Sequence, residues 1–147
     1  MKDMKKKNGS AGKLYSIVQF PSFDTKNGLL CMYQNGKKEN EVPFDIKRVL
    51  VTKCGESSEA RGAHTHHKTR QIFLVISGGC TVDIDNGTEK ASVVLSKPQE
   101  GIILEPYIWH VMRDFKPDTV CLALFDSMYD EKDYIRNYEE FLSCVKK

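Results

Sequence analysis

Turn-forming residues divide the chain into short apolar segments, and this division limits the folds that it can adopt. Nine segments of four to eight residues are rich in Val, Ile, Leu, Thr or aromatic residues: Leu14–Phe20, Gly28–Tyr33, Lys47–Lys53, Gln71–Ser77, Cys80–Asp85, Ala91–Leu95, Gly101–Leu104, His110–Phe115 and Val120–Phe125. Turn signals such as Asn27-Gly28, Gly78-Gly79 and Lys116-Pro117 separate them. Strands of this length and spacing, with no helical pattern between them, predict an all-β antiparallel sandwich or small barrel.

The two ends of the chain depart from this pattern. Residues 1–12 are rich in Lys, Gly and Ser without periodicity, and they predict a mobile leader. From Asp130 to Val145, apolar residues recur every three or four positions, which predicts one C-terminal α-helix. A chain of 147 residues that is 40% hydrophobic suffices for one core, so residues 13–147 are expected to form a single domain.

Charge and composition exclude several classes of function. Lys and Arg number 22 against 20 for Asp and Glu, and the excess lies largely at the two ends, so neither nucleic acid nor an anionic membrane is an expected partner. No apolar run approaches a membrane span or a secretion signal, which predicts a cytoplasmic protein. The five cysteines are widely spaced without a C-x-x-C pair, as expected of reduced thiols.

Two histidines, His64 and His66, are the strongest sign of a functional site. Side chains two residues apart on a strand point to the same face, so both rings would enter one space, whereas His67 would face away. The remaining histidine, His110, follows Trp109, and only one of these two can face the barrel interior; we expect it to be His110. The pair is compatible with metal ligation, with proton transfer, or with chance on an exposed edge.

The residues around the pair resemble the cupin fold, a double-stranded β-helix or jelly-roll barrel. A metal-binding cupin has Glu a few residues after its H-x-H pair, and this chain has Gln71 there, followed by Gly78. A neutral amide is a much weaker ligand than a carboxylate for hard and borderline cations. Gln71 therefore argues against a tightly held catalytic metal, although three histidines and Gln71 remain a possible ligand set.

A narrower resemblance rests on four blocks that follow one another in order. They are Pro43-Phe44-Asp45-Ile46-Lys47-Arg48-Val49, Arg61-Gly62-Ala63-His64-Thr65-His66, Pro106-Tyr107-Ile108-Trp109-His110-Val111-Met112 and Tyr129-Asp130-Glu131-Lys132-Asp133-Tyr134-Ile135-Arg136-Asn137-Tyr138. These blocks resemble the nucleotide-sugar 3,4-ketoisomerases, small cupins that act on dTDP-4-keto-6-deoxyglucose. The resemblance implies a jelly-roll barrel with one C-terminal helix, a homodimer that exchanges N-terminal strands, and a 3-keto product used in surface glycans.

The chemistry that the resemblance implies can be matched to residues. Moving the ketone from C4 to C3 removes the C3 proton and protonates C4 through an enediol, with no net redox change, so neither a metal nor another cofactor is needed. The resemblance assigns the base to His64 and a supporting role to His66. Arg48 and Arg61 are candidates for the diphosphate because a guanidinium pairs with two oxygens. Gln71 and His110 are candidates for contact with the sugar.

The sequence departs from the family at Leu50, where many members have an aromatic residue, and this change bears on substrate contact. Three alternatives therefore stay open. The chain could be a metal-dependent cupin enzyme, a nucleotide-sugar epimerase that abstracts protons beside the same ketone, or a non-catalytic cupin that binds a nucleotide sugar.

Overall fold

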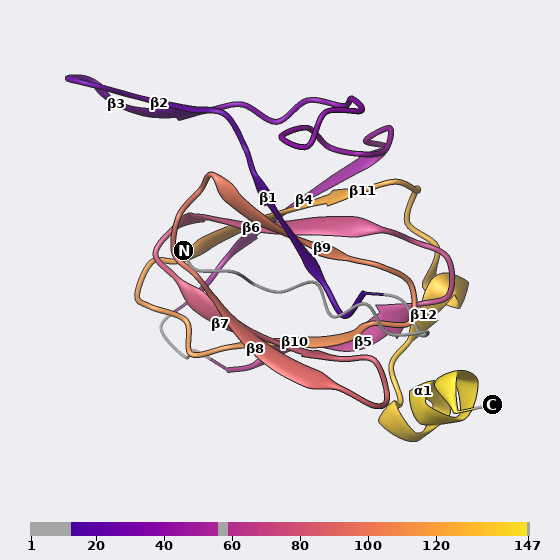
Figure 1. The fold of residues 1–147 in the computed structure, drawn as a ribbon. Helices are drawn as coiled ribbons and strands as arrows, with labels where there is room; N and C mark the ends of the chain where they lie inside the picture. Colours follow the sequence, from indigo (N-terminus) through magenta and orange to yellow (C-terminus); the bar gives the residue numbers. More distant parts are fainter. Residues whose placement is uncertain (1–12, 56–58, 147) are drawn as a thin grey trace.

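Two five-stranded antiparallel sheets pack face to face in the computed structural model, which describes residues 13–55 and 59–146 (Figure 1). The first sheet contains, in spatial order, β1 (Ser16–Gln19), β9 (Glu100–Leu104), β6 (Gln71–Ser77), β11 (Val120–Phe125) and β4 (Arg48–Lys53). The second contains β12 (Tyr134–Ile135), β5 (Arg61–His66), β10 (Trp109–Arg113), β7 (Cys80–Asp85) and β8 (Lys90–Leu95). This is the predicted all-β jelly-roll barrel. The predicted leader, residues 1–12, lies outside the described residues.

The barrel core lies between the two sheets, and a second apolar layer covers the outside of the first. Phe73 and Val75 of β6 belong to the main core together with Leu104 of the same sheet and Ile84 of the opposite one. The alternate β6 residues pack outwards against a second cluster that contains Val18, Phe20 and Val42. Because both faces of β6 are covered, its residues 72–75 form a continuous buried apolar run instead of an alternating one.

Each of the nine predicted segments matches a strand to within two residues at either end, but three strands fall outside them. One is β5, which carries the histidine pair and was expected to be a strand only from that pair. The others are β2 (Ser22–Thr25) and β12, which is two residues long. In the described residues, no helix is long and apolar enough to cross a membrane.

The C-terminal segment differs from the single helix predicted for Asp130–Val145. It forms a 3-10 turn at Glu131–Asp133, the strand β12, and then the helix α1 (Tyr138–Val145). Asn137 begins the helix because its side chain accepts a hydrogen bond from the backbone N–H of Glu140. Upstream of this cap, Tyr134 and Ile135 pair with His66 and Thr65, so strand pairing replaces the helix.

One hairpin stands away from the barrel. It consists of β2 and β3 (Gly28–Cys31), which pair only with each other within the described chain and project from the first sheet (Figure 1). Its apolar side chains Phe23, Leu29 and Leu30 are each about half exposed. An isolated two-stranded hairpin is marginally stable in water, so the arrangement leaves an apolar surface in need of a partner.

Candidate active site

The predicted histidine pair lies in the interior of the barrel. His64 of β5 pairs with His110 of β10, which in turn pairs with the core residue Ile84, so all three side chains share the inner face. The rings of His64 and His66 have centroids 5.3 Å apart, and those of His64 and His110 are 4.7 Å apart. The three predicted site histidines therefore form one cluster.

A local irregularity in β5 positions His64. Gly62 and Ala63 both have positive φ angles, of 90° and 55°, and the pairing of β10 with β5 shifts register between His110 and Val111. Such a bulge bends a strand and redirects its next side chain. A Cβ at Gly62 would also lie 3.0 Å from the carbonyl oxygen of His110, so this position favours glycine.

His110 is held as a neutral imidazole by two hydrogen bonds. Its Nδ1 lies 2.9 Å from the carbonyl oxygen of Ile108, which can only accept, so Nδ1 carries the proton. Its Nε2 then accepts a hydrogen bond from the amide of Gln71, 3.0 Å away on the opposite sheet. Gln71 and His110 are thus brought together as predicted, but they bond to each other across the barrel.

His66 is oriented by a buried carboxylate that the sequence reasoning missed. Its Nδ1 lies 3.2 Å from Oδ2 of Asp133, so Nδ1 donates and the lone pair of Nε2 remains free. Asp133 is itself held by the hydroxyl of Thr69 and by the backbone N–H of Lys68 at 2.8 Å. Burial alone would raise the pKa of Asp133, but these hydrogen bonds and the nearby His66 hold it below its ordinary value.

Burial keeps all three histidines neutral at neutral pH. It lowers the pKa of His66 to about 4, with a further contribution from the charge of His64, and it lowers that of His110 to about 3. The pKa of His64 is also lowered by burial. His64 is the most exposed of the three rings, whereas His66 and His110 are 2% and 1% exposed.

Arg48 and Tyr134 form another wall of the site. The Arg48 guanidinium lies 3.9 Å from the centroid of the Phe125 ring and donates to the Tyr134 hydroxyl at 3.2 Å. The Tyr134 ring centroid is 4.3 Å from that of His66 and 5.1 Å from that of His64. The charge of Arg48 acts on His66 and lowers its pKa, which places the guanidinium close to the histidines.

Unpartnered buried atoms converge at this point. In the described part of the chain, Nε of Arg48, Nδ1 of His64 and Nε2 of His66 are enclosed without a hydrogen-bond partner. A buried polar atom left without a partner costs about 1–3 kcal/mol, so several in one place indicate a site that a polar ligand completes. Arg48 offers a donor and His66 an acceptor to such a ligand.

Arg61 and Leu50, which the sequence analysis also singled out, are more exposed than the three histidines. Arg61 is exposed, and its charge acts on the thiols of Cys54 and Cys121, so it lies away from Arg48. Leu50 pairs with the core residue Ala123 and therefore shares the inner face of β4 with Arg48, where it is 51% exposed. The structure does not bring the two arginines into one subsite.

Trp109 and His67 point away from the cluster, as strand alternation predicts. Trp109 packs outside the barrel against Tyr138 and Phe141 of α1, with ring centroids 5.3 and 5.6 Å away. His67 is exposed, and its Nδ1 lies 3.0 Å from the hydroxyl of Tyr107. Neither side chain reaches the three clustered rings.

Sequence reasoning misplaced Tyr134 as well as missing Asp133. The predicted helix put Tyr134 on a face that packs against the barrel, whereas β12 puts it between His64 and Arg48. The available signal was Asn137, a good N-cap residue inside the predicted helix, whereas Asp130 would begin that helix as well. In the structure, the side chain of Asp130 accepts from the backbone N–H of Lys132 and begins the 3-10 turn. That turn interrupts the helical periodicity.

His110 does not fit as a metal ligand, whereas His64 and His66 each keep a nitrogen without a partner. Both nitrogens of His110 are engaged, by Ile108 and Gln71. Within residues 13–55 and 59–146, no group of three His, Cys, Asp or Glu side chains is arranged to hold a metal ion. A metal would have to displace the hydrogen bonds that orient His110.

Comparisons with known proteins agree on one family. A family model described as FdtA, WxcM-like, C-terminal matches residues 13–146. The chain is 35% identical over 131 residues to the TDP-4-oxo-6-deoxy-alpha-D-glucose-3,4-oxoisomerase of Aneurinibacillus thermoaerophilus, an alignment that covers 89% of this chain and 92% of that protein.

Solved structures match over similar lengths. One is a histidine-to-asparagine variant of the 3,4-ketoisomerase QdtA of Thermoanaerobacterium thermosaccharolyticum in complex with TDP-4-keto-6-deoxyglucose (TM-score 0.84, 31% identity, 90% of this chain and 94% of that one). Another is WlaRA, a TDP-fucose-3,4-ketoisomerase of Campylobacter jejuni (TM-score 0.80, 32% identity, 89% and 95%). The rmlC epimerase of Mycobacterium tuberculosis shares the fold at 13% identity, with a TM-score of 0.67 over 82% of this chain and 67% of that one.

The buried neutral His110 predicts a loss of stability in acid. Its folded-state pKa of about 3 lies below the ordinary 6.5, so between these values the unfolded chain binds a proton that the folded chain does not. The free energy of unfolding should therefore be highest above pH 6.5 and fall towards pH 3. Between pH 7 and pH 5, the free energy of unfolding of His110→Gln, measured by urea denaturation, should fall by about 2 kcal/mol less than that of the wild type. Equal losses in both proteins would contradict this assignment.

Proposed function

The chain belongs to the FdtA family of WxcM-like proteins, and we propose from this membership that it is a 3,4-ketoisomerase of TDP-4-keto-6-deoxyglucose. Its enzyme class is isomerase, the activity for which its relatives are named. We infer that the product is a TDP-3-keto-6-deoxyhexose, made in the cytoplasm for amination and later assembly of surface glycans. The observation that carries this proposal is the group of buried polar atoms without a hydrogen-bond partner on His64, His66 and Arg48.

The proposed reaction moves protons and no net electrons. His64 removes the proton at C3, and the electron pair of that bond forms a C3–C4 double bond while negative charge develops on the C4 oxygen. The hydroxyl proton on the C3 oxygen passes to the C4 oxygen. The C3 carbonyl then forms as C4 takes a proton from His64, so the ketone has moved by one carbon.

Basicity selects His64 as the base. A general base works best when its pKa is near the working pH, and the low pKa of about 4 makes His66 a weak base. His66 has its Nδ1 proton held by Asp133 and a free Nε2, an arrangement that suits transfer of the hydroxyl proton between the two sugar oxygens. His64 is therefore assigned the carbon-bound proton and His66 the oxygen-bound one.

The remaining polar residues receive roles from their positions. Arg48 has an unpartnered Nε beside His66 and is suited to the developing enediolate oxygen. Arg61 is exposed and lies away from Arg48, which suits it to binding the diphosphate of the substrate. Gln71 and His110 are both buried beside the other two histidines, and the second amide hydrogen of Gln71 is the donor that they offer to a sugar hydroxyl.

We propose that no metal takes part, because the hydrogen bonds of His110 leave only His64 and His66 as free histidine ligands, fewer than the three protein ligands of a typical catalytic zinc site. The expected result is that the purified protein contains no metal and keeps its activity after treatment with a chelator.

The epimerase alternative is distinguished from the isomerase by its product. Epimerisation at C3 and C5 places solvent hydrogen at those carbons and leaves the ketone at C4. The non-catalytic alternative predicts TDP-sugar binding without isotope exchange.

Replacing His64 by Asn should abolish isomerisation. In deuterated water, the wild type should convert TDP-4-keto-6-deoxyglucose to a 3-keto product with deuterium at C4, followed by NMR. His64→Asn should lose about 10²-fold to 10⁴-fold in kcat while still binding TDP, because a general base contributes that much. His67→Asn, which alters an exposed ring outside the site, is the matched control and should keep wild-type turnover. Deuterium at C4 at an undiminished rate in His64→Asn would overturn the assignment.

Replacing Asp133 by Asn should impair turnover more than binding. An amide at this position can donate to Nδ1 of His66 and so place the ring proton on Nε2, which removes the free acceptor. The expected loss in kcat is roughly 10-fold to 100-fold, the usual cost of losing a partner that orients a histidine, with KM little changed. Asp118→Asn, in an exposed turn, is the control. An effect confined to KM, or none at all, would contradict the role of Asp133.

We propose that a second copy of the chain covers the β2–β3 hairpin. The hairpin exposes Phe23 and Leu30, and the edge strand β4 exposes Val49 and Val51 on its outer face, each over more than half of its surface. β4 is the last strand of its sheet, and an unpaired edge invites another strand. Two unpartnered apolar surfaces on one chain suit a symmetric dimer.

Charging the hairpin should dissociate this dimer. Leu30→Glu would bury a charge in the proposed interface, so the mass measured by sedimentation equilibrium should fall from a dimer to a monomer. Val94→Glu, at a 69% exposed position on β8, should leave the mass unchanged. A wild-type protein that is monomeric at micromolar concentration would refute the proposal without bearing on the isomerase chemistry.

A further inference from the structure

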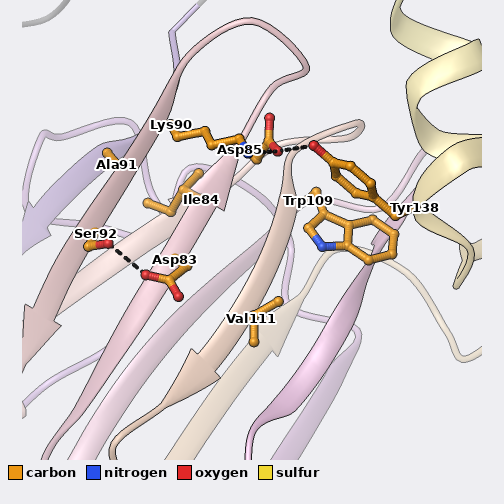
Figure 2. A pocket seen from close by; sticks show the side chains of 9 residues that line it. All are labelled: Asp83, Ile84, Asp85, Lys90, Ala91, Ser92, Trp109, Val111 and Tyr138. Carbon is orange, nitrogen blue, oxygen red and sulfur yellow. Dashed lines mark hydrogen bonds and ion pairs between the residues drawn. The ribbon is translucent and has the colours of Figure 1, made fainter.

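A cavity that is open to solvent lies outside the barrel, on the outer face of the second sheet. Its volume is about 590 Å³, and it is lined by residues of β7, β8, β10 and α1 (Figure 2). Strand register arranges its floor in two rows, Lys90–Asp85–Trp109 and Ser92–Asp83–Val111. Tyr138 of α1 stands at one end, where its hydroxyl donates to Asp85 at 2.6 Å. A volume of this size is typical of small-molecule sites.

Trp109 lines the cavity with a polar group that has no partner among the described residues. The residue is only 9% exposed, but its ring N–H is not one of the fully buried atoms that lack a partner, so solvent reaches it. Figure 2 shows the indole nitrogen on the side of the ring that faces away from Tyr138, towards Asp83 and Val111. Because the ring is packed against Tyr138 and Phe141, this N–H is a fixed donor that a ligand can engage in place of water.

The charges in the cavity are already balanced. Asp83 is paired with Arg113 at 2.6 Å, and Asp85 lies 3.8 Å from the Lys90 ammonium. An anion would meet two carboxylates, and a cation would find no unpaired negative charge. The electrostatics therefore favour a neutral ligand.

The cavity offers a ligand both hydrogen-bond donors and hydrogen-bond acceptors. Ser92 donates to Asp83 at 2.6 Å and Tyr138 donates to Asp85, so both hydroxyl oxygens keep lone pairs free to accept. Trp109 supplies a donor, while Val111 supplies an apolar surface between these groups. A ring whose hydroxyls each donate and accept, and whose C–H face is apolar, matches this arrangement.

We propose that this cavity is a second binding site, distinct from the histidine cluster, for a neutral pyranose ring. Strand β10 separates the two sites, because Trp109 faces the cavity and His110 faces the barrel interior. The sugar can be free or attached to a nucleotide, and both forms present the same ring to the cavity. The site requires no contact with the catalytic residues.

The single tryptophan makes the proposal directly testable. Methyl α-D-glucopyranoside and methyl α-L-rhamnopyranoside are titrated into ¹⁵N-labelled protein, both without TDP and with saturating TDP, and the one indole N–H resonance is followed. A saturable shift with at least one pyranoside is expected in the wild type and in Val94→Leu, the control on the same strand. Ser92→Leu should lose the shift because its side chain fills the second row, and Ser92→Ala should weaken it. Both variants should keep wild-type isomerase turnover.

Other outcomes would overturn the proposal. They are no shift with either pyranoside, an equal shift with inorganic phosphate or tetramethylammonium, a shift that TDP abolishes, or a resonance that changes with protein concentration alone. The last would indicate that a second copy occupies the cavity. A tighter response to TDP-glucose than to the methyl pyranosides, in TDP-saturated protein, would support the proposal and identify a nucleotide-linked sugar as the source. The shift with the methyl pyranosides in protein without TDP does not depend on whether the isomerase assignment holds.

Discussion

The buried contact between Asp133 and His66 is the interaction on which the site depends. A carboxylate that is 5% exposed is tolerable only when its oxygens are hydrogen-bonded, and Thr69, Lys68 and His66 supply those bonds. The same contact joins the C-terminal segment to β5, because β12 pairs with the strand that ends in His66. The tail therefore completes the second sheet, fixes the tautomer of His66 and brings the Tyr134 ring against the histidines.

Three clustered imidazoles would repel one another if charged, and burial keeps all three neutral while their hydrogen bonds differ. His110 is fully buried and hydrogen-bonded at both nitrogens, so it neither gains nor loses a proton readily. His66 is fixed on one side only. His64 has the most solvent access and no strong partner among the described residues, which leaves it free to change its protonation state during turnover. The sequence offers no reason to expect three histidines of different basicity, and their different degrees of burial create that difference.

The sequence predicted what depends on local pattern and missed what depends on long-range pairing. Strand alternation was sufficient to place His64, His66 and His110 inside and Trp109 outside, because that rule involves only neighbouring residues. The tail was different: its apolar spacing suited a helix, but pairing with β5 gave Tyr134 and Ile135 a strand conformation that no local signal required. Asp133 could not be recognised as an orienting residue without knowing that it lies beside His66. The bulge at Gly62 and Ala63 was likewise invisible in the pattern of apolar residues.

Strand β10 carries side chains of two chemically different sites on its opposite faces. Successive side chains of a strand point to opposite faces, so His110 belongs to a closed interior with low-pKa rings while Trp109 belongs to an outer cavity with balanced charges. The two side chains also meet different constraints: His110 is tied to the first sheet through Gln71, and Trp109 is packed against α1. A ligand at one face can affect the other only by moving the backbone that both share, and that backbone is hydrogen-bonded on both sides by β5 and β7. The wall is therefore stiff, which favours independent occupation of the two faces over coupling between them.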